Sequence, residues 1–303
     1  MSVPMINPTS MASYRLKRKA APYLYLSPSL VVVALLMLLP MCMVIAYSFQ
    51  ESAVLRPDAR FAGLKHYREI FSDNVYWAAL WHTLYFTIVS VIMHMILGLT
   101  FALMLNSDRV SPWLRSLLRV LYILPWLFTQ VIIAVIWRLL LEPNGVVNSV
   151  LMNLGIIGSK IQWFSSTETA LQAVTFANIW AGYPLFMVSL LAGLQGIPKD
   201  LYEAADIDGA TGPQKLFFIT IPQLMPIIIS ISLLDFIWTM QVFPLIWLTT
   251  GGGPIYATEV LSTYTYKLAF AQYDLSQAAA SAVTILLLSI GLTLFYIRHQ
   301  KAR

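Results

Sequence analysis

The sequence predicts an all-α integral membrane protein with six transmembrane helices and both termini in the cytoplasm. Of its 303 residues, 58% are hydrophobic and 11% are charged, and the mean hydropathy is +0.72. A soluble domain carries about 25% charged residues. The apolar residues also form long charge-free runs that can cross a hydrocarbon core of about 30 Å. The net charge of +5 comes from cations at the ends of these runs rather than from one patch, which argues against a nucleic-acid partner.

The candidate spans begin with a charge-free run over residues 24–47. A basic segment precedes this run, but no small-x-small cleavage site follows it, so we expect an uncleaved span. The third span is interrupted by Pro125 and ends near Arg138, whose long side chain can reach the interface. The stretch 216–248 is too long for one span, so we end that helix near Met240 and place the remainder at the outer surface. The six spans are about 24–47, 81–105, 117–141, 171–194, 216–240 and 277–297, between tails of residues 1–23 and 298–303.

The distribution of Lys and Arg predicts the orientation. If the N-terminus is inside, the cytoplasmic segments hold twelve Lys and Arg residues and the outer loops hold six. An excess of these residues is typical of cytoplasmic segments. Both termini are then inside, and the loop 195–215 lies on the cytoplasmic side.

The chain has no catalytic or metal-binding pattern. Its one cysteine, Cys42, lies inside the first span, where we expect a small apolar packing residue, and no intrachain disulfide is possible. No GxxxxGK[ST] phosphate loop is present, so we expect no ATP hydrolysis by this chain alone. We also expect no cofactor and no metal site, because four histidines lack the spacing of metal ligands: His66, His82, His94 and His299.

The loop 195–215 contains a predicted short helix. Pro198 suits the first helical position, Asp200 lies in the first turn, where the helix dipole favours an anion, and Gly209 is the expected left-handed C-cap. The alternative is an ordinary solvated loop. The helical period predicts an alanine face that permits close approach of another backbone and an acidic face for a basic partner. These faces carry Leu201, Ala204 and Ala205 on one side, and Tyr202, Glu203 and Asp206 on the other.

This loop also has a specific residue spacing. E-A-A stands at residues 203–205, G at 209 and I-x-I-P at 219–222. The pattern resembles the EAA loop, E-A-A-x3-G-x9-I-x-L-P, of permease subunits in binding-protein-dependent ABC importers. One position departs from it, since Ile221 replaces Leu. The segments 177–211 and 247–254 resemble sugar-importer permeases of the maltose and glycerol-3-phosphate type, and the resemblance covers about residues 22–297.

The resemblance implies the ABC importer permease fold in a bacterial inner membrane. It also implies a second related permease, two ABC ATPase subunits that bind ATP and Mg²⁺, and an extracytoplasmic solute-binding protein. The EAA loop would form a coupling helix that docks in a groove of the ATPase subunit. Glu203 would face a basic groove residue, Ala204 and Ala205 would permit close approach, and Gly209 would end the helix.

A sugar site in such a protein needs hydroxyl partners and an aromatic face near mid-depth, where polar groups are costly and mark function. The fourth span supplies Asn178, Trp180 and Tyr183, about one turn apart. Other polar candidates are Gln130, Asp235 and Gln241. Each of these residues can instead make an interhelical hydrogen bond or pack against a neighbouring helix.

Other functions fit the sequence less well. A stand-alone secondary transporter needs intramembrane acids or repeats for ion coupling, and the spans show only Asp235 and no clear inverted repeat. Glycerol 3-phosphate or another sugar phosphate is the alternative substrate of an importer. A basic cavity would favour it, but we find no cation near the midplane and therefore expect a neutral sugar, bound by this subunit or by its partner permease.

Overall fold

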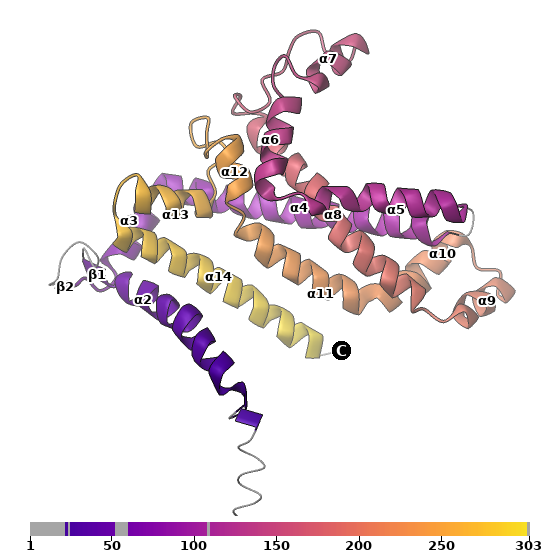
Figure 1. The fold of residues 1–303 in the computed structure, drawn as a ribbon, viewed down its shortest axis with the longest axis horizontal. Coiled ribbons are helices and arrows are strands. Elements are labelled where there is room, and N and C mark those ends of the chain that lie inside the picture. Colours follow the sequence, from indigo (N-terminus) through magenta and orange to yellow (C-terminus); the bar gives the residue numbers. More distant parts are fainter. Residues whose placement is uncertain (1–21, 24, 52–59, 108–109, 302–303) are drawn as a thin grey trace, which may run out of the picture.

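The computed structural model describes residues 22–23, 25–51, 60–107 and 110–301, and it is a bundle of long helices (Figure 1). The predicted N-terminal tail lies outside the described residues except for Pro22 and Tyr23. The described chain contains one short antiparallel pair of strands, in which Gln50 pairs with Phe61. The elements in chain order are η1 (Ala34–Leu38), α2 (Leu39–Tyr47), β1 (Gln50–Glu51), β2 (Arg60–Phe61), α3 (Lys65–Ser72), α4 (Asn74–Asn106), α5 (Pro112–Leu127), α6 (Gln130–Leu140), α7 (Val146–Asn153), α8 (Ala170–Gln195), α9 (Lys199–Ile207), α10 (Gly212–Lys215), η2 (Leu216–Thr220), α11 (Ile221–Met240), α12 (Pro244–Thr249), α13 (Leu261–Phe270) and α14 (Leu275–Lys301).

Five helices of the described chain are long and apolar enough to cross a membrane, and a bent pair makes up to six. The five are Tyr25–Tyr47, Asn74–Asn106, Ala170–Gln195, Gly212–Met240 and Leu275–Leu294. They coincide with five of the expected spans, and the fifth span ends at Met240 as the sequence predicts. α4 begins earlier than expected because the Asp73 side chain accepts a hydrogen bond from the Val75 amide (2.8 Å) and caps the helix.

The third expected span is not one straight helix. α5 and α6 meet at 101°. The predicted interruption at Pro125 is wrong in position, because α5 continues through Pro125 to Leu127. The break falls at Phe128 and Thr129, and the Thr129 hydroxyl caps α6 by accepting from the Ile132 amide (3.4 Å). The bend turns the first residues of α6 away from the direction of α5.

The segment after Met240 is packed against the rest of the chain, and its place at the outer side of the membrane stays a prediction. It folds back as α12, whose Leu245 and Ile246 are each 1% exposed and pack against α6. The helices α3, α7 and α13 are short and were not expected from the apolar runs. α3 and α13 lie at one end of the bundle, and α9 and α10 lie at the opposite end (Figure 1).

The core of the bundle is the contact between α4 and α8. A Cβ on Gly98 would lie 2.3 Å from the Phe186 Cβ and 2.9 Å from the Met187 amide nitrogen, so the two backbones meet at glycine. Phe186, Met187 and Leu190 are fully buried in the cluster around this contact. Small residues permit such close approach between membrane helices, where dispersion contacts rather than water exclusion hold the pair together.

The first helix, in contrast, has no buried residue over Tyr25–Tyr47. Cys42 is exposed, so the expectation that it packs inside the protein is wrong for this chain by itself. The helix lies at the edge of the bundle (Figure 1), and its apolar surface is free for lipid or another subunit.

We expect Gly98→Ala to lower the free energy of unfolding by about 1–3 kcal/mol, because the added methyl group overpacks the α4–α8 contact. Gly291→Ala in α14 is the matched control, since nothing lies within 4 Å of its Cβ position. Thermal unfolding of the purified protein in detergent measures both. Equal unfolding temperatures for the two variants would contradict this account of the core.

Candidate functional site

A partly open cavity of about 330 Å³ with a mostly apolar wall lies among the helices. Its walls come from α4, the bend between α5 and α6, α8 and the last turns of α11. A few convergent polar groups in an apolar and aromatic wall are typical of a small-molecule site. The polar residues are His94, Thr129, Gln130, Asn178, Asp235 and Thr239, and the aromatic residues are Trp126, Phe128 and Trp238.

His94 connects three helices at this cavity and is 1% exposed. Its Nε2 lies 3.0 Å from the Asn178 carbonyl oxygen on α8, and its Nδ1 lies 2.8 Å from Asp235 Oδ2 on α11. A carbonyl oxygen only accepts, so Nε2 carries a hydrogen. The contact between Nδ1 and the carboxyl group then needs a second proton. The pair is either imidazolium with carboxylate or imidazole with carboxylic acid, and its net charge is zero in both forms.

Gly182 makes room for this arrangement. A Cβ at Gly182 would lie 2.2 Å from Cε1 and 2.3 Å from Nε2 of His94. The absence of a side chain therefore lets the imidazole ring lie directly against α8. Asp235 is held from the other side as well, because the Thr239 hydroxyl donates to its Oδ1 (3.3 Å).

Asn178 lines the cavity and carries a buried amide nitrogen. Its side chain is 7% exposed, and among the described residues its Nδ2 has no hydrogen-bond partner. A buried amide without a partner costs free energy, so its presence indicates a group that a bound molecule or water satisfies. On the neighbouring face of α4, the buried hydroxyls of Thr87 and Ser90 likewise have no partner in the described chain.

The structure brings three of the six predicted sugar-site residues together: Gln130, Asn178 and Asp235 line the cavity. Tyr183 is not among the lining residues and packs on Phe101, with ring centroids 5.1 Å apart. Trp180 packs edge-to-face on Trp137 at 5.7 Å, behind the cavity wall. Gln241 is exposed at the end of α11.

The sequence did not predict the cavity residues His94, Thr129 and Thr239, and His94 is the ionisable one. His94 lacks the spacing of metal ligands, so it was not a candidate ligand. It also lies where the sequence predicts no cationic group. The available signal was its position within an apolar span, because an intramembrane ionisable residue marks function by default and calls for a partner. Asp235 was that partner.

The predicted helix in the loop 195–215 is α9, at the end of the bundle (Figure 1). Pro198 precedes its first residue rather than occupying it. Gly209 has φ +75°, the left-handed conformation that the sequence predicts. The Gly209 amide donates to the Asp206 carbonyl (3.1 Å) and the Ala210 amide to the Ala205 carbonyl (2.9 Å), which is the Schellman pattern.

The two faces of α9 differ from the prediction. Tyr202 and Ala205 are half-buried toward the bundle, whereas Glu203, Ala204 and Ile207 are exposed. The tyrosine therefore does not share a free face with Glu203. Ile207, 87% exposed, adds an apolar contact to that face, which the sequence analysis did not identify.

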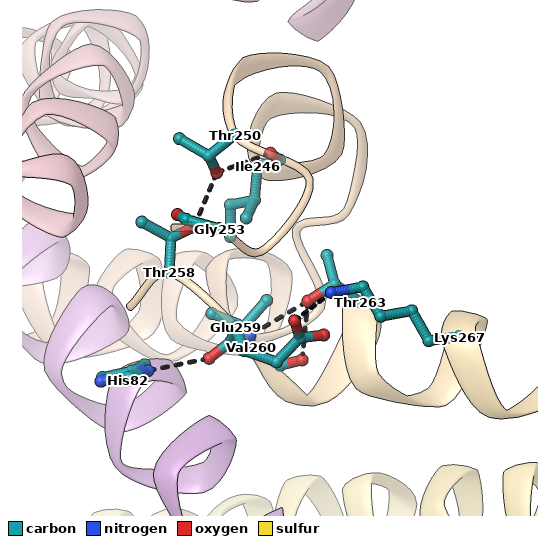
Figure 2. Close-up of polar contacts among 9 residues, drawn as sticks. All are labelled: His82, Ile246, Thr250, Gly253, Thr258, Glu259, Val260, Thr263 and Lys267. Carbon is teal, nitrogen blue, oxygen red and sulfur yellow. Dashed lines mark hydrogen bonds and ion pairs between the residues drawn. The ribbon is translucent and has the colours of Figure 1, made fainter. Parts of the chain in front are cut away.

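At the other end of the bundle, a buried ion pair supports the glycine-rich turn after α12 (Figure 2). Glu259 is fully buried, and Lys267 of α13 pairs with its Oε2. Gly252 lies directly over the carboxylate, where a Cβ would be 2.2 Å from Oε2. The Thr258 hydroxyl donates to the Gly253 carbonyl (2.7 Å), and His82 Nδ1 of α4 donates to the Glu259 carbonyl (3.0 Å).

A tyrosine fixes α13 to the start of α4 beside this turn. The Tyr264 hydroxyl donates to Asp73 Oδ2 (2.8 Å). Burial and the neighbouring carboxylate raise the pKa of Tyr264, so the phenol stays protonated and keeps donating. The turn and α13 are therefore joined to the rest of the chain at several points.

Comparison with known proteins identifies the family. Residues 94–302 match the model of the binding-protein-dependent transport system inner membrane component. The chain belongs to this family. It is 36% identical to the trehalose/maltose transport system permease protein MalF of Thermococcus litoralis, over 98% of each chain. It is also 33% identical to the sn-glycerol-3-phosphate transport system permease protein UgpA of Yersinia pestis, over 93% of this chain and 94% of the relative.

Solved structures agree with the fold of this permease. A bacterial ABC transporter involved in the import of the acidic polysaccharide alginate contains a chain that matches with a TM-score of 0.83. The match covers 96% of this permease and 99% of that chain at 24% identity, so it establishes the shared fold. The protein is thus a multi-pass membrane component of an ABC importer.

We expect Lys267→Met to lower the free energy of unfolding by up to about 3 kcal/mol, because it leaves the buried Glu259 carboxylate unpaired. Adding Glu259→Gln should recover part of this loss. Lys65→Met is the control, since Lys65 and Glu51 form an exposed pair. Thermal unfolding in detergent measures all three, and a double variant less stable than Lys267→Met would contradict the pairing account.

Proposed function

We propose that this permease moves a neutral sugar through the membrane by alternating access, driven by ATP hydrolysis on partner subunits. The cavity that contains His94, Asn178 and Asp235 is the observation that carries the proposal. It lies beside the middle of α4 and α8, the depth at which a translocated solute must pass. Curated relatives with maltose, sulfoquinovosyl glycerol and glycerol 3-phosphate in their names support a sugar or sugar-like substrate, and trehalose and maltose are the neutral ones among them.

The charge of the cavity supports a neutral sugar over a sugar phosphate. When His94 is the imidazolium, it is the cationic group of the cavity, and the Asp235 carboxylate neutralises its charge. A phosphate would therefore meet a neutral pair and a buried carboxyl group rather than a cation. Sugar hydroxyls can donate to the Asp235 carboxyl group and accept from the Asn178 amide, and Gln130 supplies both types of group.

Coupling to ATP is assigned to α9. Glu203 and Ile207 on its free face would contact a groove of an ABC ATPase subunit, Ala204 would permit close approach, and Gly209 would end the helix. Ala205 lies on the other side, toward the bundle. To shift the population ratio of two permease conformations from 1:99 to 99:1, the ATPase must bind one conformation more favourably than the other by about 5.5 kcal/mol.

The remaining partners follow from the family. We place a second related permease beside this chain, an ABC ATPase subunit that binds ATP and Mg²⁺ under each permease, and an extracytoplasmic solute-binding protein at the end that carries α3 and α13. The end with α9 is cytoplasmic, with both termini, in a bacterial inner membrane. The exposed first helix and the excess of Lys and Arg in the inner segments support this assembly.

We expect Asn178→Ala to reduce sugar uptake about fivefold, the factor that corresponds to the loss of one typical hydrogen bond to the substrate. Its Nδ2 bonds no described protein group, so its removal should leave thermal stability unchanged. Gln241→Ala, off the cavity, is the control. Uptake into proteoliposomes is measured after ligand screening of the cognate binding protein has identified the sugar. Normal uptake by Asn178→Ala, or a loss of stability equal to the loss of uptake, would reject the cavity assignment.

We expect Glu203→Lys and Gly209→Val to insert normally but to bring down less ATPase subunit, and to abolish stimulation of ATP hydrolysis by the loaded binding protein. A β-branched residue at φ +75° strains the end of α9 by about 1–2 kcal/mol. Gly209→Asn is the control, because Asn tolerates this conformation and open space surrounds the Cβ position. Normal ATPase recovery and stimulation in both test variants would reject α9 as the coupling element.

A further inference from the structure

Two side chains of α9 bond to the segment that begins the fifth span. The Tyr202 hydroxyl lies 2.9 Å from Thr220 Oγ1, and Asp206 forms an ion pair with Lys215. Tyr202 and Asp206 are four residues apart and therefore lie on one face of α9. Tyr202 is half-buried against the bundle, whereas Asp206 is exposed and lies three residues from Glu203, at the edge of the face that carries Glu203 and Ile207. One side of the helix is thus free for a partner, and the other side is attached to the bundle.

The contact with Thr220 has a defined direction. The Thr220 hydroxyl donates to the Lys215 carbonyl (3.2 Å), so its oxygen accepts from the phenol of Tyr202. Thr220 is 4% exposed and Tyr202 is half-buried, which protects the bond from water. The Asp206 side chain is 63% exposed, so its ion pair with Lys215 is screened and contributes less. The tyrosine bond is the main attachment.

These two bonds hold both ends of η2. In this π-helical turn the Ile221 amide bonds to the Leu216 carbonyl, five residues back. Pro222 follows at the start of α11 and has no amide hydrogen to offer to the preceding turn. π turns often mark functional positions in helices. Because Lys215 and Thr220 flank the turn and both bind α9, the turn must move together with α9.

The attachment selects one span. α8 reaches α9 through Gly196, Ile197 and Pro198, which have no polar side chains, so this connection is made by the backbone alone. The fifth span receives the Tyr202 bond directly and carries Asp235 fifteen residues beyond Thr220, about 22 Å along the helix at the usual rise. We propose that Tyr202, with Asp206, is a positioning residue that ties α9 to the fifth span and transmits displacement of α9 to the Asp235 end of the cavity.

This inference rests on the proposed function, in which α9 docks on the ATPase subunit. The test variant is Tyr202→Phe, which keeps the ring and removes the bond to Thr220. Thr220→Val removes the same bond from the other side. Tyr273→Phe, exposed in the loop before α14, is the matched control. The permease is reconstituted with its partner subunits and binding protein, and three quantities are measured: recovery of ATPase subunit, thermal stability, and sugar molecules transported per ATP hydrolysed.

We expect Tyr202→Phe and Thr220→Val to recover normal amounts of ATPase subunit and to lower the transport ratio about fivefold, the factor that one typical hydrogen bond corresponds to. The double variant should be no worse than either single variant, because both remove one bond. A normal ratio in Tyr202→Phe would overturn the inference, as would a loss of stability without a change in ratio. If both Tyr202→Phe and Glu203→Lys retained normal coupling, the docking role of α9 itself would be rejected. If Glu203→Lys lost coupling and Tyr202→Phe did not, only the role of Tyr202 in linking α9 to the fifth span would be rejected.

Discussion

The interaction on which the interior of this permease depends is the contact of His94 with two other helices. Its imidazole ring fixes α4 to α8 through a backbone carbonyl and to α11 through Asp235. Such groups are expensive within a membrane unless they are paired. The pairing explains the glycine at 182, since any side chain there would occupy the position of the ring. The same contact places Asp235 at the cavity, next to the close packing of α4 on α8 at Gly98.

Because the pair shares its protons and remains neutral, the cavity can keep polar groups in the bilayer without a counter-ion. The lining residue Asn178 keeps an amide nitrogen that has no partner in the described chain. A rigid interior contact next to unsatisfied donors is the arrangement that holds a site in shape before the substrate enters. The bend between α5 and α6 completes it, because a straight third span would direct Gln130 and Phe128 along the helix rather than to the same wall.

The sequence predicts the long helices well because each is a charge-free apolar run of membrane length. It also predicts the left-handed Gly209, because few other residues adopt that conformation readily. It could not predict the break at Thr129, since Pro125 is the stronger local signal and the helix accommodates it within its last turns. Nor could periodicity assign the faces of α9, because Tyr202 turns inward to reach Thr220, which is eighteen residues away in sequence. The sequence likewise could not predict the pairing of His94 with Asp235, because the two residues are 141 positions apart and meet only in the tertiary structure.

The fifth span joins α9 to the cavity, the two regions to which we assign coupling and substrate binding. At one end it receives the bonds from α9, and near the other end it presents Asp235 and Thr239 to the cavity. A helix transmits displacement along its axis when its own hydrogen bonds are intact, and this span is irregular at the π turn before Pro222 and at Pro226 inside α11. The side chains of α9 bond to both ends of that turn. The attachment therefore lies at a point where the span would otherwise absorb motion by bending, which gives a physical reason for Tyr202 to face the bundle instead of the partner subunit.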